Sequence, residues 1–484
     1  MPARRKIAQG EVGPDPGRFG VGDLLRADLA KLHQAVSDAK DRPNRALGAL
    51  IRLFTWSEKH GAYRTKIAYC PPLRLLWSFL PSDGSAAMFV HKSYEREVWR
   101  ERGPWGRLRL LAAILLFWPA VTLGTMVWVT WLNGPVIRRR TGKGLLRQMA
   151  EQLRLAAVHA VLPPWYYVFD LYDDARRTSA AQYLHRYETK GGIFRLLKRE
   201  LGGRNLSPLQ DKLLFAQRCQ EHGVTVVPVI LIAKKGDLLS VEGGKPRLPS
   251  ADVFLKPILG RGGKGAERWD CPEPDCYKNA AGVRLTEAEM LERLRSLSRK
   301  ADYLVQPRLV NHPDIADLSN GALCTARIMT CQDEHGGFEA TSAVFRMAIG
   351  GNRVVDNFHA GGIAAKVDIA TGELGPATDL GISARLGWRN EHPDTGTRIP
   401  GRKLPLWRET LDLVCRAHAA FSDRIVIGWD VAIHKDAPIL IEGNGAPDVD
   451  IIQRVSGEPL GDTRFGELLA FHVKHALQRR GQKA

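Results

Sequence analysis

The feature that most restricts the fold of this 484-residue chain is a pair of apolar runs near its C-terminus, separated by a short polar turn. The runs cover residues 425–433 and 438–448. Two β-rich runs joined by so few residues predict an antiparallel hairpin. Pairing them symmetrically about the turn places Asp430 opposite Glu442. Because side chains alternate along a strand, Asn444 then shares a face with Glu442.

The predicted hairpin brings three oxygen ligands to one point. Two carboxylates and an amide, from Asp430, Glu442 and Asn444, suit Mg²⁺, which also takes phosphate and water oxygens. Mn²⁺ accepts the same ligands. The alternative is that these polar residues are simply solvated at strand ends. Against it, Asp430 lies between apolar neighbours, where an unpaired charge is costly. We therefore predict a metal site.

The composition restricts the class of partner. With 44% hydrophobic and 25% charged residues, the chain resembles ordinary globular proteins of two or three domains. A net charge of +18 implies an acidic partner, which can be nucleic acid, anionic lipid or a phosphorylated substrate. The basic residues are spread out and cluster best beside an apolar segment, which favours an anionic membrane surface over nucleic acid. Seven scattered cysteines show no disulfide framework and favour a reducing compartment.

Five regions are predicted along the chain, and no feature indicates an oligomeric state. Residues 1–106 form a mostly helical region of unknown role, whose polar start does not indicate a secretory signal. Residues 107–140 form a hydrophobic segment, and residues 141–206 a helical connector. Residues 207–475 alternate strand-like and helix-like runs, which indicates an α/β or α+β catalytic domain. A basic tail, 476–484, follows.

The hydrophobic segment contains 23 uncharged residues, 110–132, and about 20 suffice to cross a bilayer. Trp105, Trp128 and Trp131 are placed as interfacial anchors would be. Both flanks are basic, so the charge bias gives no orientation. Three interpretations stay open: a re-entrant or interfacial hairpin with both ends cytoplasmic, a true span, and a buried helix of a soluble domain. We expect the protein at the cytoplasmic face of the inner (plasma) membrane.

A second informative segment joins a β-rich run, 253–257, to a glycine-rich loop at 260–265. The loop formally matches the dinucleotide fingerprint, but no clear helix follows; nor does Ser or Thr follow its lysine, as a Walker A loop requires. A glycine loop between strands can instead fold over a triphosphate, which its backbone N–H groups and lysines contact. The alternative is a solvated basic turn. The candidate phosphate ligands are Lys256, Gly260, Gly262, Gly263, Lys264 and Gly265.

Further candidates lie on either side of this loop. Lys212 begins a predicted helix and on its own would be read as a surface lysine. The apolar run 223–232 predicts a strand. Gln306 lies where another predicted strand ends at a polar hinge, a place that can present backbone groups to an adenine edge. Arg327, on the following strand, can counter a phosphate or a substrate carboxylate.

A polar glycine turn at 356–362 completes the set of candidates. Backbone amides in such a turn can hold a developing oxyanion or a phosphate. The turn contains Asn357, and Lys366 follows it in the next strand-like run. We take Arg327, Asn357 and Lys366 as candidate catalytic residues. His359 is more often structural in such a setting, and no serine or cysteine has a recognisable nucleophile motif.

The order of these elements resembles the ATP-grasp superfamily, and more narrowly the sugar-transfer-associated ATP-grasp group related to α-L-glutamate ligases. The resemblance covers about residues 150–475 and is strongest at the Lys256 loop and at Glu442-Gly-Asn444. It implies an ATP-grasp fold of two α+β subdomains that hold ATP between them. The helical region and hydrophobic segment before residue 140 are not part of that core fold.

The resemblance also implies roles for individual residues. Lys212 and Lys256 match lysines that contact the α- and β-phosphates, and the loop 260–265 matches a mobile lid. Gln306 lies where the hinge contacts adenine. The arginine often found just before the first metal ligand is absent here, and Arg424 or Arg327 would replace it. The magnesium ligands match Asp430, Glu442 and Asn444.

The reaction implied is carboxylate activation by ATP. A carboxylate attacks the γ-phosphate to give an acyl phosphate and ADP, and an amine then displaces phosphate. Mg²⁺, lysine and arginine neutralise charge during this transfer, and no enzyme nucleophile is needed. We therefore predict a ligase acting on a cell-envelope or exopolysaccharide-related substrate, and thus in polysaccharide biosynthesis.

Two alternatives to this ligase remain. One is a phosphotransferase with a hydroxyl acceptor. The other is a non-catalytic nucleotide-binding scaffold in a polysaccharide assembly complex. The intact set of three metal ligands argues against the scaffold, which has no need of all three.

Overall fold

The computed structural model describes residues 72–79, 84–200, 208–260, 265–350, 358, 361–381, 384 and 387–483. The chain from Tyr69 onward forms one compact unit. The mostly helical region predicted for residues 1–106 is therefore described only from residue 72, with a gap at 80–83.

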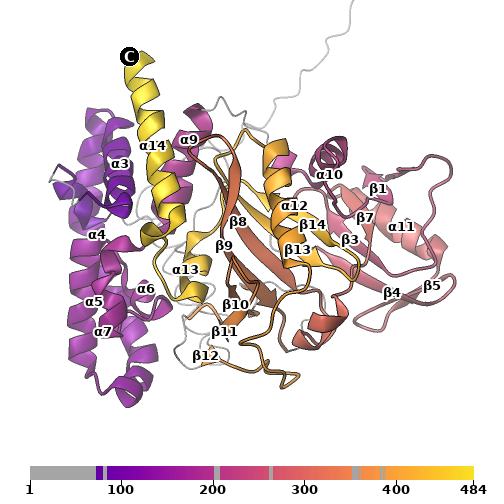
Figure 1. Ribbon diagram of the computed structural model, residues 1–484, viewed down its shortest axis with the longest axis horizontal. Helices are drawn as coiled ribbons and strands as arrows, with labels where there is room; N and C mark the ends of the chain where they lie inside the picture. Colours follow the sequence, from indigo (N-terminus) through magenta and orange to yellow (C-terminus); the bar gives the residue numbers. More distant parts are fainter. Residues whose placement is uncertain are drawn as a thin grey trace, which may run out of the picture. The chain divides into compact units, whose positions relative to one another are not determined.

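Two antiparallel sheets are present, and the one with the shorter strands is here called the smaller sheet. Its strand order is β2-β1-β7-β3-β4-β5-β6, and β1, β3, β4, β5 and β7 are labelled in Figure 1. Helix α11, Glu287–Ser298, starts at a capping box made by Thr286 and Glu289. It buries Met290 and Leu294 against apolar residues of this sheet. The strands are β1 Leu231–Lys234, β2 Asp237–Ser240, β3 Val253–Pro257, β4 Glu267–Glu273, β5 Cys276–Asn279, β6 Arg284–Leu285 and β7 Tyr303–Pro307.

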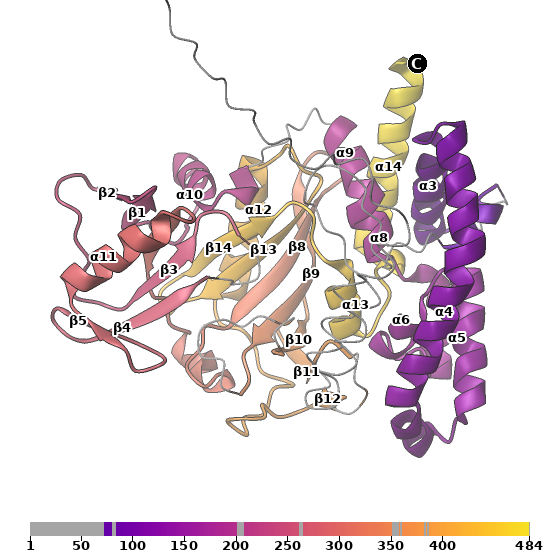
Figure 2. The same cartoon turned by 180° about the vertical axis from the view of Figure 1, so that it is seen from behind.

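The larger sheet also has seven strands, in the order β12-β11-β10-β9-β8-β13-β14. One face packs against α10, Lys212–Glu221, and α12, Trp407–Ala420. The other face packs against α9, α13 and α14 (Figure 2). The remaining bounds are β8 Thr325–Gln332, β9 Phe338–Met347, β10 Ile363–Val367, β11 Leu374–Thr378, β12 Trp388–Arg389, β13 Val426–Ile433, β14 Pro438–Asn444, α9 Phe194–Glu200, α13 Val449–Ser456 and α14 Arg464–Lys483.

Helices from the N-terminal half complete the unit. Helix α3 packs on α14, and Ala87 and Val90 of α3 belong to the same core as Phe465 and Leu468. Helices α4 and α5 run side by side (Figures 1 and 2). The bounds are η2 Leu73–Trp77, α3 Ala86–Arg100, α4 Pro104–Thr141, α5 Leu145–His159, α6 Pro163–Val168, α7 Asp174–Thr178, η3 Ala180–Gln182, α8 Arg186–Glu188, η4 Thr189–Ile193, η5 Pro208–Gln210, η6 Pro313–Leu318 and η8 Leu460–Asp462.

Helix α4 contains the whole uncharged run predicted from the sequence. In the part of the chain that the structure describes, it is the one helix long and apolar enough to cross a membrane, by length and composition alone. Its contact with α5 is partly polar: Gln152 donates to Thr130 Oγ1 at 2.8 Å, and Gln148 donates to the Gly134 carbonyl at 3.2 Å. Within the described unit, α4 therefore uses one side for protein contacts.

The segment between α10 and β1 connects the two sheets. The Val227 amide donates to the Leu440 carbonyl of the larger sheet, whereas the Ile230 amide donates to the Val305 carbonyl of the smaller sheet. The strand predicted over 223–232 begins only at Leu231, so that prediction was wrong for most of its length. The segment divides its hydrogen bonds between two sheets, and Pro228 has no N–H to continue a ladder.

Candidate active site

The β13–β14 hairpin places the predicted metal ligands together. Asp430 pairs with Glu442, and Gly428 pairs with Asn444, so the pairing predicted from the sequence is confirmed. A β-bulge at Ile441 makes this register possible, because the pairs nearer the turn follow a register shifted by one residue. Glu442 and Asn444 therefore lie on the same face as Asp430.

A single row of paired residues crosses five strands of the larger sheet. Lys366 pairs with Val344, Val344 with Arg327, Arg327 with Asp430, and Asp430 with Glu442. Paired residues of adjacent strands point to the same side of a sheet. The row therefore places Arg327, Asp430 and Glu442 on one face. Since neighbouring strands are about 4.8 Å apart, Lys366 lies roughly 19 Å from Glu442 along the sheet.

Lys366 is thus the outlying member of the row. Its Nζ forms an exposed ion pair with Glu458 at 2.9 Å. The other candidate from this part of the sequence, Asn357, lies outside the described residues. The middle of the glycine-rich loop also lies outside them, namely Gly262, Gly263 and Lys264.

Two arginines hold the Asp430 carboxylate. Arg327 Nη2 donates to Oδ2 at 2.7 Å and its Nε bonds Oδ1, while Arg346 Nη2 lies 3.0 Å from Oδ2. Burial alone would raise the pKa of Asp430, but the two guanidinium groups hold it well below its usual range. Asp430 is therefore an anion although it is only 4% exposed.

Arg346 was missed in the sequence analysis. It lies on β9 and reaches Asp430 across β8, while its Nε donates to Thr325 Oγ1 at 2.9 Å. The sequence feature that could have indicated Arg346 is its position as a single charged residue between the apolar Phe345 and Met347 in a strand-like run. By contrast, Arg424 pairs with Asp423, so the arginines that hold Asp430 are Arg327 and Arg346.

Lys256, on β3 of the smaller sheet, is a buried cation. Its side chain is 7% exposed, and no described residue accepts a hydrogen bond from its ammonium or pairs with it. Burial lowers the pKa of Lys256 to about 8, although the carboxylates of Glu442 and Asp430 favour the charged form. A buried ammonium without a partner is costly, so the position is suited to an anion.

Lys212 lies at the start of α10, beside the glycine-rich loop. The Asp211 side chain caps the helix, and Lys212 Nζ donates to the Gly260 carbonyl at 3.1 Å and to the Ile258 carbonyl at 3.4 Å. Burial lowers the pKa of Lys212, while Glu442 acts in the opposite direction. The electrostatic influence of Glu442 thus extends to both predicted phosphate lysines.

Gly265 ends the glycine-rich loop in a backbone conformation that only glycine adopts easily. Its φ is +77°, and a Cβ at this position would lie 2.9 Å from Tyr303 Oη and 3.1 Å from Pro257 Cγ. Both the left-handed backbone and the contact exclude a larger residue. The loop is therefore fixed at its end beside β3.

Gln306 is buried on β7, and its side chain bonds protein rather than pointing to an open site. Its Nε2 donates to the Val227 carbonyl at 2.9 Å. Val227 belongs to the segment that connects the two sheets, so Gln306 ties the end of β7 to this hinge. The predicted contact with adenine through the strand end stays a prediction.

The oxygen ligands of the hairpin fit a magnesium ion. Asn444 Nδ2 donates to Glu442 Oε1 at 3.5 Å, and no described residue donates to Asn444 Oδ1. Two carboxylates and one amide oxygen form a hard donor set that leaves positions for phosphate and water. Among the described residues no group of three His, Cys, Asp or Glu side chains could hold a metal, so this predicted site has only two carboxylates and depends on the Asn444 amide for its third protein oxygen.

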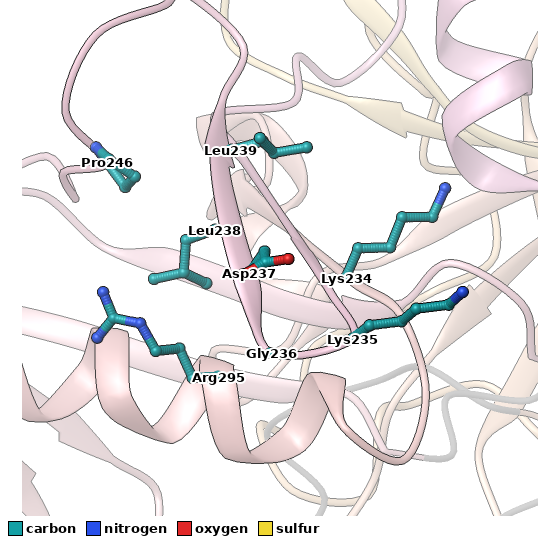
Figure 3. A pocket seen from close by; sticks show the side chains of 8 residues that line it. All are labelled: Lys234, Lys235, Gly236, Asp237, Leu238, Leu239, Pro246 and Arg295. Carbon is teal, nitrogen blue, oxygen red and sulfur yellow. The ribbon is translucent and has the colours of Figure 1, made fainter.

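A pocket in the smaller sheet lies apart from these residues. It is formed by the β1–β2 hairpin and the neighbouring α11 (Figure 3). None of the residues predicted for the site lines it. Its lining is Lys234, Lys235, Gly236, Asp237, Leu238, Leu239, Pro246 and Arg295.

The sequence of residues 195–464 matches the family described as sugar-transfer associated ATP-grasp, over more than half of the chain. The chain belongs to the sugar-transfer associated ATP-grasp family. The matched region of this ATP-grasp protein begins in α9 and ends at the first residue of α14. It contains both sheets and every candidate site residue, whereas α3 to α8 precede it.

Solved structures that resemble this ATP-grasp chain share little sequence with it. D-alanyl-alanine synthetase A from Vibrio cholerae is 11% identical with a TM-score of 0.33, and the match covers 56% of this chain and 66% of the synthetase. L-amino acid ligase from Bacillus licheniformis is 12% identical with a TM-score of 0.33, and the match covers 63% of this chain and 59% of the ligase. N5-carboxyaminoimidazole ribonucleotide synthetase bound to ADP is 11% identical with a TM-score of 0.31, and the match covers 53% of this chain and 50% of the synthetase. The chain thus spans half to two thirds of these proteins. No curated protein matches it.

Proposed function

We propose that this chain is an ATP- and Mg²⁺-dependent carboxylate ligase that acts through an acyl phosphate. The supporting observation is the buried ammonium of Lys256, with which no described residue pairs. The carboxylates of Glu442 and Asp430 on the other sheet act on it electrostatically. A polyphosphate between them would give the ammonium its partner. It would also bring phosphate oxygens to the metal ligands, as an ATP-grasp fold requires.

Each group in the site has a distinct task in this proposal. Lys212 and Lys256 hold phosphate oxygens. Asp430, Glu442 and Asn444 hold Mg²⁺, which when bound neutralises charge on the phosphates. Arg327 keeps Asp430 ionised and adds positive charge near the phosphoryl group in transfer.

The chemistry has two steps. A substrate carboxylate oxygen attacks the γ-phosphorus, and the bond from phosphorus to the β–γ bridging oxygen breaks, which releases ADP and leaves an acyl phosphate. An amine nitrogen then attacks the acyl carbon, loses a proton and displaces inorganic phosphate. A covalent enzyme intermediate is not required. Burial raises the pKa of the Cys219 thiol to about 12 and raises that of Cys331 as well, so neither supplies a thiolate at neutral pH.

We assign the substrate to the acids of cell-envelope or exopolysaccharide synthesis, and the enzyme to the cytoplasmic face of the plasma membrane. The association of the family with sugar transfer and the long apolar helix α4 support this assignment. The acceptor is then an amine or a related nucleophile on another precursor of cell-envelope or exopolysaccharide synthesis.

The test is to incubate the protein with ATP, Mg²⁺ and panels of acids and amines. We expect ADP, and hydroxylamine should trap the acyl phosphate as a hydroxamate. Glu442→Gln should lower turnover by about 100-fold or more, since it weakens the Mg²⁺ site that neutralises charge on the phosphates. The exposed Glu409→Gln is the matched control and should keep full activity. Formation of AMP, or full activity of Glu442→Gln, would refute the proposal.

A further inference from the structure

In the part of the chain that the structure describes, helix α4 has one exposed apolar face. Six large apolar side chains along it are between 47% and 74% exposed, and Trp105 at its start is 76% exposed. Apart from the adjacent Leu115 and Leu116, successive members are four or seven residues apart, which places them on one side of a helix. Contiguous apolar surface of this extent marks an interaction site. The α4 apolar face consists of Leu108, Leu115, Leu116, Leu123, Val127 and Trp131.

The opposite side of α4 is attached to the folded unit at both ends. Near the N-terminal end, Ile114 packs with Leu75 beside α3, and α3 is joined to α14 by an ion pair of Glu97 with Arg480 at 2.7 Å. Near the C-terminal end, Asn133 Oδ1 accepts a hydrogen bond from the Ala384 amide at 2.8 Å.

These attachments restrict how α4 can meet a bilayer. A helix of 38 residues is about 57 Å long, and a spanning helix places its ends on opposite sides of a hydrocarbon layer about 30 Å thick. Both ends of α4 instead contact one folded unit. The helix therefore lies along that unit, with its apolar face turned outward.

The charges beside this face identify its partner. From residue 102 to residue 150 the chain has eight lysines and arginines and no acidic residue. Arg107 and Arg109 are exposed near one end of the helix, and Arg138 and Arg139 near the other. An apolar face bordered by cations fits a bilayer surface that contains anionic lipids. A second copy of the same face would bring like charges together, which disfavours a dimer.

We propose that α4 anchors this protein to one leaflet of an anionic bilayer, with the helix axis along the membrane surface and the whole described unit on one side. The inference rests on the membrane location in the proposed function, and deepens it by specifying the anchor. It does not require the ligase reaction. A membrane-borne acid or acceptor would then reach the active site from the surface on which the enzyme lies.

The experiment is flotation of the purified full chain with vesicles. We expect binding to phosphatidylcholine vesicles that contain phosphatidylglycerol, and about tenfold weaker binding to phosphatidylcholine alone or at high salt. L116E/L123E should lose at least about tenfold in binding, since it places charge in the apolar face. Leu239→Glu, at a 55% exposed leucine on β2, is the matched control and should bind normally. Unchanged binding of L116E/L123E would overturn the proposal.

Two further measurements separate the other arrangements. Alkaline carbonate should release the protein from natural membranes, whereas retention with the integral proteins would show a span and refute the anchor. The second measurement is sedimentation without lipid. If the wild type is a dimer that the L116E/L123E substitutions dissociate, and if it does not bind vesicles, the face is an interface between copies and the membrane anchor is refuted. Glu442→Gln should float like the wild type, so failure of catalysis and failure of docking are distinguishable.

Discussion

Lys256 is a cation whose charge depends on what binds beside it. Its pKa of about 8 in the unliganded protein means that it is largely protonated below pH 8 and loses its proton as the pH rises further. A polyphosphate binds the protonated form. ATP affinity should therefore be nearly constant from pH 7 to about 8 and then fall by up to tenfold per pH unit.

Calorimetric titration with ATP across this range is the measurement. Lys256→Arg provides the control, because arginine keeps its charge throughout and should remove most of the pH dependence. Wild-type affinity that does not change above pH 8 would contradict the assignment of Lys256 to the phosphates.

Arg346 contributes to the site through Asp430. Removing its guanidinium as Arg346→Met leaves a buried carboxylate with one ionic partner instead of two. We expect a loss of about 3 kcal/mol in the free energy of unfolding, measured with urea. In an Asp430→Asn background the same substitution should cost much less, because the charge that it serves is gone. Equal losses in both backgrounds would show that Arg346 acts elsewhere.

At the scale of elements, the glycine-rich loop is restricted at its end by Gly265. Gly265→Ala should destabilise the protein and weaken ATP binding, because the added Cβ meets Tyr303 in a left-handed backbone. Gly282→Ala is the matched control: its φ is +86° but nothing lies within 4 Å of the added Cβ. It should show the backbone cost alone, about 1 kcal/mol. Thermal unfolding and ATP titration compare the two variants. An identical effect of both would contradict a role for the Tyr303 contact.

The strands show how much of the site could be predicted from the sequence. The Asp430–Glu442 pair was predictable because both residues lie in one hairpin, where local order determines which residues meet. The bulge at Ile441 was not predicted, since no glycine or other turn residue marks it. Arg346 was missed because its approach to Asp430 depends on the pairing of β9 with β8 and on β13 joining them from a distant part of the chain.

Lys366 illustrates the opposite case. It was selected because it follows a polar glycine turn, but the strand order places it three strands from Asp430, where it pairs with Glu458. Sequence proximity to a turn does not determine how far across a sheet a strand lies.

At the scale of the whole molecule, the helices before residue 200 share buried polar contacts with the matched ATP-grasp region. Arg454 of α13 is 2% exposed; it pairs with Asp170 at 2.8 Å and donates to the Val168 carbonyl and to Thr378 Oγ1. Arg454→Met should lower the free energy of unfolding by about 3–5 kcal/mol, because it leaves Asp170 with less compensation.

Arg464→Met is the control for this prediction in urea unfolding. Arg464 pairs with Glu334 and Glu339 at the surface, where ion pairs contribute little. Its substitution should have a much smaller effect. A similar loss in the two variants would contradict the idea that Arg454 joins the helices to the larger sheet.

The sequence predicted an uncharged segment long enough to meet a membrane, but not which side of the helix stays exposed. That side is decided by contacts such as the one between Asn133 and Ala384, which are 251 residues apart. Hydrophobicity along the segment carries no such information.

The same separation has a consequence for biosynthesis. At 5–20 residues per second, a ribosome adds Ala384 about 13 to 50 s after Asn133. During that interval α4 has emerged without one of the partners of its polar side, and it has the composition of a nascent membrane span. For the surface placement proposed above, targeting factors or chaperones would have to keep the helix from inserting until the last strands are made.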